Sequence, residues 1–284
     1  MKFGLYVPNF GAWGDAAALM NLAERAESSG WDGVYLWDHI APPTVIGMKN
    51  GDFVDPWVAL AAMATRTERV RLGTLVTPLP RRRVTNLARQ TVSVDRLSQG
   101  RLTLGVGIGG GPDEFDNLGE ESAAKIRARQ LDEGLDLLTQ LWSGTEIQFD
   151  GEFNRIRRAQ FLPQATQQPR VPIWVGGVYP AKAPMRRMAR WDGMFPVMTA
   201  REPAARLTQL KESIDFVRAE REKHARSGTF DIAYTGVSRD GSTADTLRLA
   251  EQVAALGVTW WLEAIQPQLY GFDSNDPAAR TPIL

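Results

Sequence analysis

Short apolar segments alternate with longer amphipathic segments along almost the whole chain. The short segments are apolar on both faces, which is typical of strands in a parallel sheet that helices cover. Eight such strands are expected, over residues 2–8, 33–37, 70–77, 102–106, 172–175, 193–198, 230–237 and 258–263. An open doubly wound sheet shows the same alternation, and the count of eight is what favours an α/β fold with a single (β/α)8 TIM barrel.

Capping residues help to define the helices between these strands. Asp15 is placed to cap a helix that ends at Gly30, and Asp55 with Pro56 opens the next one. Gly100 ends a third helix, whose apolar residues recur at spacings of three and four. Further helices are expected near residues 131–142, 183–190, 202–226 and 244–256.

The alternation pauses between residues 143 and 170. Within this stretch, apolar and polar residues alternate around Asp150 and Gly151, which predicts a short hairpin inserted after the fourth strand–helix unit. The stretch is too short for a second domain, so we expect one domain over residues 1–284. Its tail, residues 266–284, contains several Pro, Asp and Asn residues and looks irregular.

Composition narrows the classes of partner and compartment. Lysine plus arginine and aspartate plus glutamate both total 33, so no nucleic-acid or membrane-surface partner is indicated. The absence of cysteine excludes thiolate nucleophiles and cysteine-ligated metals. The apolar start is too short for a signal peptide, and no stretch is long enough to span a membrane. We therefore expect a cytoplasmic protein.

In a β/α barrel the active site lies where the strands end and the following loops begin. The residues expected there are Asn9, Asp38, His39, Thr77, Gly107–Gly111, Gly176, Gly177, Met198, Ser238 and Glu263. His39 is one of only two histidines, and His224 lies in a charged helix that solvent should surround. A neutral imidazole at position 39 is suited to general acid–base work. A histidine that merely caps the strand end is the alternative.

Two glycine-rich loops follow strands. Residues 105–111 formally contain the G-x-G-x-x-G pattern, but the acidic residue and second strand that a dinucleotide site requires do not follow. This loop, and Gly176 with Gly177, leave backbone N–H groups open to a cofactor ring or phosphate. Plain turns are the alternative. Arg81, Arg82 and Arg83 could also bind a phosphate, although a solvated charge run is the commoner explanation.

The sequence lacks the residues that two other kinds of barrel enzyme require. None of the six lysines follows a strand, which argues against a Schiff-base aldolase. Two distant histidines argue against a zinc site, and no metal ligand set is expected. Since polar catalytic groups are sparse, the chemistry is expected to belong to a bound organic cofactor.

Several segments, in this order and spacing, resemble the bacterial luciferase-like family of flavin- and deazaflavin-dependent oxidoreductases. They are residues 30–39 (GWDGVYLWDH), 71–80 (RLGTLVTPLP), 95–109 (DRLSQGRLTLGVGIG), 172–177 (PIWVGG) and 190–193 (RWDG). The resemblance covers residues 2 to about 263. It implies a β/α barrel with an insertion after the middle strands, and reduced FMN, or the deazaflavin coenzyme F420, at the barrel mouth.

The resemblance also assigns roles to residues. His39 matches the active-site histidine, and Asp38 its acidic neighbour near the cofactor ring. A non-proline cis peptide is implied at Leu75–Val76, where it would bulge against the isoalloxazine. The remaining cofactor contacts that it implies are Gly107 and Gly109 beside the ring and Gly176 and Gly177 beside the phosphate. One departure is Gly110, which stands where the deazaflavin sugar-phosphate dehydrogenases carry a proton-donating glutamate.

The leading hypothesis is a monooxygenase that uses reduced FMN from a separate flavin reductase, and oxygen, on a small organic substrate. Trp37, Met198 and Trp260 are expected to wall the substrate pocket, although core packing is the alternative for Trp260 or its neighbour Trp261. An F420-dependent hydride-transfer enzyme and a non-catalytic flavin-binding protein are the other functions considered. Because family members are often dimers, a homodimer is also considered.

Overall fold

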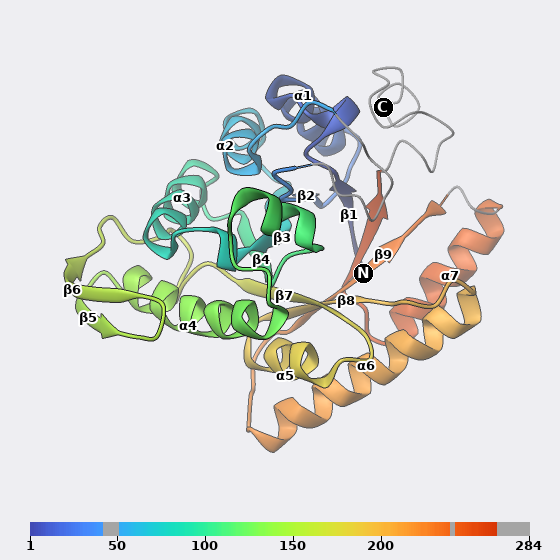
Figure 1. Ribbon diagram of the computed structural model, residues 1–284. Coiled ribbons are helices and arrows are strands. Elements are labelled where there is room, and N and C mark those ends of the chain that lie inside the picture. The colour runs from blue at the N-terminus through green and yellow to red at the C-terminus, as the bar shows by residue number, and fades with distance from the viewer. Residues whose placement is uncertain (42–50, 239–241, 266–284) are drawn as a thin grey trace.

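The computed structural model describes residues 1–41, 51–238 and 242–265, and the expected irregular tail at residues 266–284 lies outside them. Eight parallel strands close into a barrel, in the order β1-β10-β9-β8-β7-β4-β3-β2 (Figure 1). They are β1 (Lys2–Val7), β2 (Gly33–Leu36), β3 (Arg71–Pro78), β4 (Leu102–Gly107), β7 (Ile173–Val178), β8 (Gly193–Val197), β9 (Asp231–Gly236) and β10 (Trp260–Ala264). The predicted barrel is confirmed, with strand ends within three residues of expectation. The largest difference is at β7, which continues to Val178, so Gly176 and Gly177 lie in the strand and not in the loop after it.

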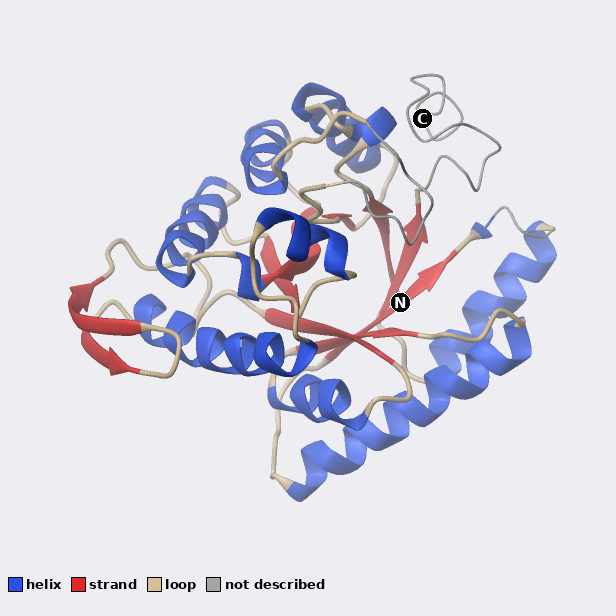
Figure 2. Ribbon diagram, in the orientation of Figure 1, coloured by secondary structure: helices blue, strands red, loops and turns tan. Residues whose placement is uncertain are grey.

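Helices lie on the outside of this barrel (Figure 2). In the described residues they are α1 (Ala16–Ser28), α2 (Pro56–Arg66), α3 (Val84–Leu97), α4 (Ala124–Trp142), α5 (Lys182–Arg190), α6 (Pro203–Lys223) and α7 (Thr243–Ala255). Asp15 caps α1 by accepting from Ala17 and Ala18, and Asp55 caps α2 in the same way, as their positions in the sequence predict.

The pause in the sequence pattern corresponds to an antiparallel hairpin between α4 and β7. Its strands are β5 (Glu146–Asp150) and β6 (Arg155–Gln160), and Gly151 N–H donates to Asn154 O across the turn. The hairpin stands away from the barrel (Figure 2).

The barrel interior is filled with aromatic rings. Tyr35 stacks on Trp174 with ring centroids 5.3 Å apart, and Trp260 meets both rings edge-on. Tyr6, Leu75, Val76 and Phe195 lie in the same cluster. Because Trp260 pairs with Lys2 at the first positions of β10 and β1, its ring lies toward the amino ends of the strands. The interior is therefore a packed core, and only the opposite end can hold a site.

None of the helices in the described ranges is long and apolar enough to cross a membrane.

Candidate active site at the barrel mouth

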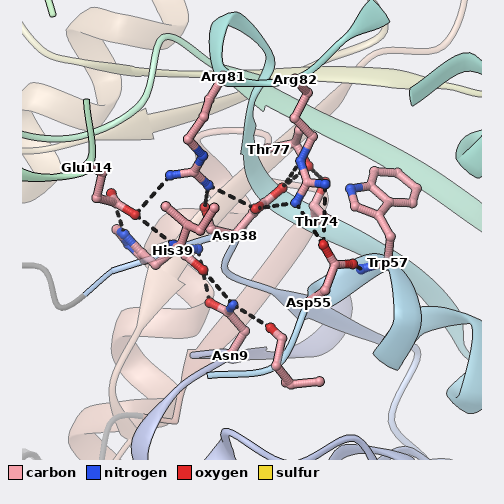
Figure 3. A network of polar contacts seen from close by, with 12 residues as sticks. Asn9, Asp38, His39, Asp55, Trp57, Thr74, Thr77, Arg81, Arg82 and Glu114 are labelled. Atoms are coloured by element: carbon pink, nitrogen blue, oxygen red, sulfur yellow. Dashed lines mark hydrogen bonds and ion pairs between the residues drawn. The ribbon is translucent and has the colours of Figure 1, made fainter. Parts of the chain in front are cut away.

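His39 forms a pair with a residue from a distant loop. Its Nδ1 lies 2.7 Å from Oε2 of Glu114, which belongs to the short helix η4 (Pro112–Glu114) after β4 (Figure 3). The Glu114 side chain is 4% exposed and that of His39 is 21% exposed. Since Nε2 has no hydrogen-bond partner among the described residues, one ring nitrogen is fixed and the other is available for chemistry.

The strand end is also fixed through the backbone of His39. Asn9, buried after β1, accepts a hydrogen bond from His39 N–H and donates its amide to the carbonyl oxygens of His39 and Val54. The imidazole stands beside the rings of Phe10 and Trp37, with centroids 5.7 and 5.5 Å away. His39 is therefore a positioned side chain at the mouth, as the strand-end argument predicts.

Arg81 holds the other oxygen of the same glutamate. Its Nη1 donates to Glu114 Oε1 at 2.9 Å, and Ile40 N–H donates to that oxygen as well. Burial raises the pKa of Glu114, but the hydrogen bond and charge of His39, with the contributions of Ile40 and Arg81, outweigh it, so the pKa lies below its usual value. Glu114 is consequently a carboxylate at neutral pH, and His39 donates its Nδ1 proton to it.

The expected solvated arginine run is only partly solvated. Arg83 is exposed, but the Arg81 and Arg82 side chains are 3% and 17% exposed and both bind Asp38. The expectation fails for these two because buried carboxylates from other elements lie within reach of their guanidinium groups. Burial lowers the pKa of Arg82, but the charge of Asp38 overcomes this effect and raises it.

Asp38 is fully engaged by these neighbours. Arg81 and Arg82 donate to Oδ1, while Arg82 Nε and the Thr77 hydroxyl donate to Oδ2 (Figure 3). A carboxylate offers about four lone-pair positions, and all are used here. We therefore infer that Asp38 organises the site through its arginines and leaves direct cofactor contact to other groups.

Val76 forms a ledge at the mouth. The peptide bond between Leu75 and Val76 is cis, as the resemblance implies, and the pairing of β3 with β4 shifts register between Thr74 and Thr77. A Cβ added to Gly107 would lie 2.8 Å from one γ-carbon of Val76, and one added to Gly176 would lie 2.7 Å from the other. These two glycines leave room for the Val76 side chain.

The other two glycines of the predicted site have different local reasons. Gly109 has a φ of 86° and faces the Phe115 ring, where an added Cβ would lie 2.6 Å away. An added Cβ on Gly177 would lie 2.3 Å from Pro184 of α5. Gly109 therefore shapes the loop that carries Glu114, and Gly177 lets α5 pack on β7.

A cavity of about 510 Å³ opens beside the ledge, at the ends of β1, β2, β8, β9 and β10. Trp37 and Met198 line it, as predicted, together with Tyr6, Phe195 and Tyr234. Trp260 does not, because its ring is packed in the barrel core at the other end of the strand. We therefore assign Trp260 to the core and not to the pocket wall.

Ser238 and Glu263, also expected at the mouth, brace each other. Glu263 Oε1 accepts from the N–H and hydroxyl of Ser238, and Oε2 accepts from the Trp261 indole. This carboxylate ties the end of β9 to the end of β10 and is used structurally. In the described residues no cluster of His, Asp and Glu could hold a metal ion.

Glu114 and the cavity-lining rings of Tyr6 and Phe195 are not predicted from the sequence, and Arg81 is predicted only as a phosphate-binding or solvated residue. The only early signal for Glu114 was that it follows a strand end by several residues in a glycine-rich loop. Tyr6 and Phe195 sit inside apolar strands, where pattern alone does not separate the mouth from the core.

The mouth has the chemistry that a flavin ring needs. A half-buried apolar ledge at Val76 stands beside a cavity lined by aromatic rings, and His39 with its carboxylate lies next to Trp37. Flat cofactors bind in concave, largely apolar sites with a few placed polar groups. The residues present therefore fit a flavin or deazaflavin.

The chain matches a known protein family over almost its whole length. A family model described as luciferase-like monooxygenase matches residues 1–279. An uncharacterized protein of Mycobacterium bovis is 30% identical over 243 residues, which cover 81% of this chain and 80% of that protein. An F420-dependent glucose-6-phosphate dehydrogenase of Gordonia bronchialis is 34% identical over 172 residues, which cover 60% of this chain and 49% of that enzyme.

The barrel is similar to a solved structure. The crystal structure of monooxygenase RslO1 from Streptomyces bottropensis superimposes with a TM-score of 0.69 at 24% identity, covering 100% of this chain and 83% of that chain. At this identity the likeness concerns the fold.

Proposed function

Because the chain belongs to the luciferase-like monooxygenase family of oxidoreductases, we propose that it is a monooxygenase that uses reduced FMN and oxygen on a small organic substrate. The observation that carries the proposal is the pairing of the Val76 ledge with an aromatic cavity and a positioned histidine at one barrel mouth. Reduced FMN, when bound, supplies the two electrons with which dioxygen is divided between substrate and water.

Different side chains of the protein would support the cofactor, exclude water and move a proton. Val76, whose side chain fits into the space left by Gly107 and Gly176, would support the ring, and Gly177 with the start of α5 would hold the phosphate. Tyr6, Trp37 and Phe195 line the cavity and exclude water from it. His39 holds or moves a proton at Nε2, because Glu114 occupies Nδ1.

An F420-dependent hydride-transfer enzyme is the second candidate, and the similarity to F420-dependent glucose-6-phosphate dehydrogenase favours it. Two features weigh against that sugar-phosphate reaction. The resemblance places Gly110 where the deazaflavin sugar-phosphate dehydrogenases would carry a proton-donating glutamate. The carboxylate that this loop does supply, Glu114, has a lowered pKa and accepts hydrogen bonds, so it is a poor proton donor.

Anaerobic equilibrium binding tests the choice. The purified protein is titrated with reduced FMN and, separately, with reduced F420. Tighter binding of FMN, followed by substrate-dependent oxygen consumption, supports the monooxygenase. Tighter binding of F420, with turnover in the absence of oxygen, replaces it with the hydride-transfer enzyme. Binding of neither rejects both.

The His39→Ala variant separates an enzyme from a non-catalytic flavin-binding protein. If His39 is a general acid–base group, kcat falls by about 10²–10⁴-fold while cofactor affinity stays within a few-fold. The solvent-exposed His224→Ala variant is the matched control. Unchanged kcat in His39→Ala contradicts the role given to His39.

Two further proposals concern partners. Reduced FMN would come from a separate flavin reductase, and the protein would act as a homodimer, as the resemblance implies. Oxygen consumption that depends on added reductase and NADH, and a sedimentation mass of twice the 31.5 kDa chain, are the expected results.

A further inference from the structure

The cavity at the mouth combines apolar walls with positive charge. Its charged lining residues are Arg201, in the loop between β8 and α6, and Arg206, in the first turns of α6. No aspartate or glutamate is among the described residues that line it. The rest of the wall is mostly aromatic and aliphatic, including Tyr6, Trp37 and Tyr234.

In the part of the chain that the structure describes, Arg81 and Arg82 form ion pairs with carboxylates, whereas the two guanidinium groups of the cavity do not. Neither one forms an ion pair within the described residues, and Arg206 donates only a long hydrogen bond, 3.4 Å, to Ala200 O. The Trp37 indole N–H is buried and has no acceptor among the described residues. The cavity therefore offers two guanidinium groups that no carboxylate of the described residues neutralises.

A partly buried guanidinium gains most from a charged acceptor, and a carboxylate can take two hydrogen bonds from one arginine. Arg206 is half-buried, and Arg201 stands exposed at the rim of the same cavity. We propose that the cavity selects organic anions, with a flat apolar body against the aromatic wall and a carboxylate facing Arg201 and Arg206. This assignment rests on the proposed function, whose substrate class it names.

The phosphate of the cofactor is the other anion that these arginines could meet. The cavity is lined from β1, β2, β8, β9 and β10, whereas the ledge and its glycines belong to β3, β4 and β7. The two halves of the mouth are thus built from different strands. This division favours the substrate as the occupant of the half that carries the arginines.

Binding of a matched pair of probes tests the assignment. Naphthalene-2-carboxylate and naphthalene-2-carboxamide have the same size and differ in charge. Isothermal titration at 0.15 M salt is expected to show the acid binding at least tenfold more tightly than the amide. The double variant Arg201→Gln/Arg206→Gln should abolish this preference and leave the affinity for the amide unchanged. Arg206→Lys should retain part of it.

Arg186→Gln, which removes an exposed arginine of α5, is the matched control and should keep the full preference. Equal binding of acid and amide by the unaltered protein, or a preference that survives the double substitution, overturns the proposal.

Titration of the same double variant with FMN and with riboflavin separates the two sources of negative charge. An unchanged preference for FMN over riboflavin supports the substrate assignment. Loss of that preference would show that the arginines bind the cofactor phosphate, and it rejects the proposal. If the unaltered protein binds no flavin or F420 yet discriminates acid from amide, the proposed function fails while the anion site stands.

Discussion

Oε2 of Glu114 lies 2.7 Å from Nδ1 of His39, and this contact defines which nitrogen of the imidazole can do chemistry. The carboxylate is ionised because its partners lower its pKa, so the proton of the neutral ring stays on Nδ1. Nε2 then carries a lone pair. Glu114 is in this sense a positioning residue: it acts on the reaction through His39.

Glu114→Gln should reverse the imidazole tautomer. The amide oxygen of glutamine would best face Arg81 and Ile40, which both donate to Glu114 Oε1, so its NH₂ would face Nδ1. A donor opposite Nδ1 requires that nitrogen to accept, which moves the proton to Nε2. Long-range ¹H–¹⁵N spectra at pH 8 report this directly, because the chain has only two histidines and exposed His224 is the internal reference. An unchanged His39 pattern contradicts the assigned role of Glu114.

The same substitution should lower stability in a pH-dependent way. The pKa of Glu114 in the folded protein lies below that of an unfolded glutamate, about 4.3, so its contribution is complete above that value and is lost as pH falls through the folded pKa. At pH 7, Glu114→Gln should therefore unfold in urea with a free energy about 1.5–3 kcal/mol lower than the unaltered protein.

This difference should shrink below about pH 4.3, because there the unfolded glutamate takes up its proton before the folded one does. Glu251→Gln, on the exposed face of α7, is the control and should change stability by less than about 0.5 kcal/mol at either pH. A difference between Glu114→Gln and the unaltered protein that stays constant from pH 7 to pH 3 would argue against an ionised Glu114.

The Val76 ledge can be tested by crowding it. An added Cβ in Gly176→Ala would lie 2.7 Å from a γ-carbon of Val76, so the variant should lose about 1–3 kcal/mol of stability and bind flavin more weakly. Val76→Ala in the same molecule removes that γ-carbon and should restore part of the loss. A double-mutant cycle should give a coupling of roughly 1 kcal/mol.

Gly177→Ala is the matched control for this cycle. Its added Cβ would meet Pro184 of α5 instead, so Val76→Ala should not rescue it. Rescue of both glycine variants, or of neither, would show that the glycines do not serve the Val76 side chain in the way the contacts indicate.

The sequence predicts the barrel well because each strand carries its signal locally. Apolar residues on both faces and capping residues such as Asp15 and Asp55 need no knowledge of distant neighbours. His39 was predictable for the same reason, since it directly follows a strand. These features depend on a few consecutive residues.

The charge network was not predictable because it depends on contacts between distant segments. Arg81 reaches Asp38 across 43 positions and Glu114 across 33, and an arginine run on a solvated face has the same local sequence. The tryptophans show the same limit. Trp260 and Trp261 are adjacent in one strand and both buried, and only the closed barrel places the first ring inside it.

Trp260 and Trp37 should therefore respond differently to substitution. Trp260 is 1% exposed among Tyr35 and Trp174, so Trp260→Ala should cost about 3–5 kcal/mol of stability through the cavity it leaves. Trp260→Phe is the milder variant, and it should fold and bind ligands at the mouth as before. Trp37 lines the cavity, and Trp37→Phe removes an indole N–H that has no protein acceptor in the described residues.

Neither indole N–H has a protein acceptor in the described residues, so packing decides the difference. Trp37 borders the open cavity whereas Trp260 is enclosed by the barrel core, so Trp37→Phe should change the free energy of unfolding by less than Trp260→Phe does. It should nevertheless weaken naphthalene-2-carboxylate binding several-fold, since it removes aromatic ring area from the cavity wall. Urea unfolding and isothermal titration of the two phenylalanine variants measure both quantities. The reverse result would be a stability loss confined to Trp37→Phe and a binding loss confined to Trp260→Phe. It would show that Trp260 lines the pocket and that the site lies deeper in the barrel.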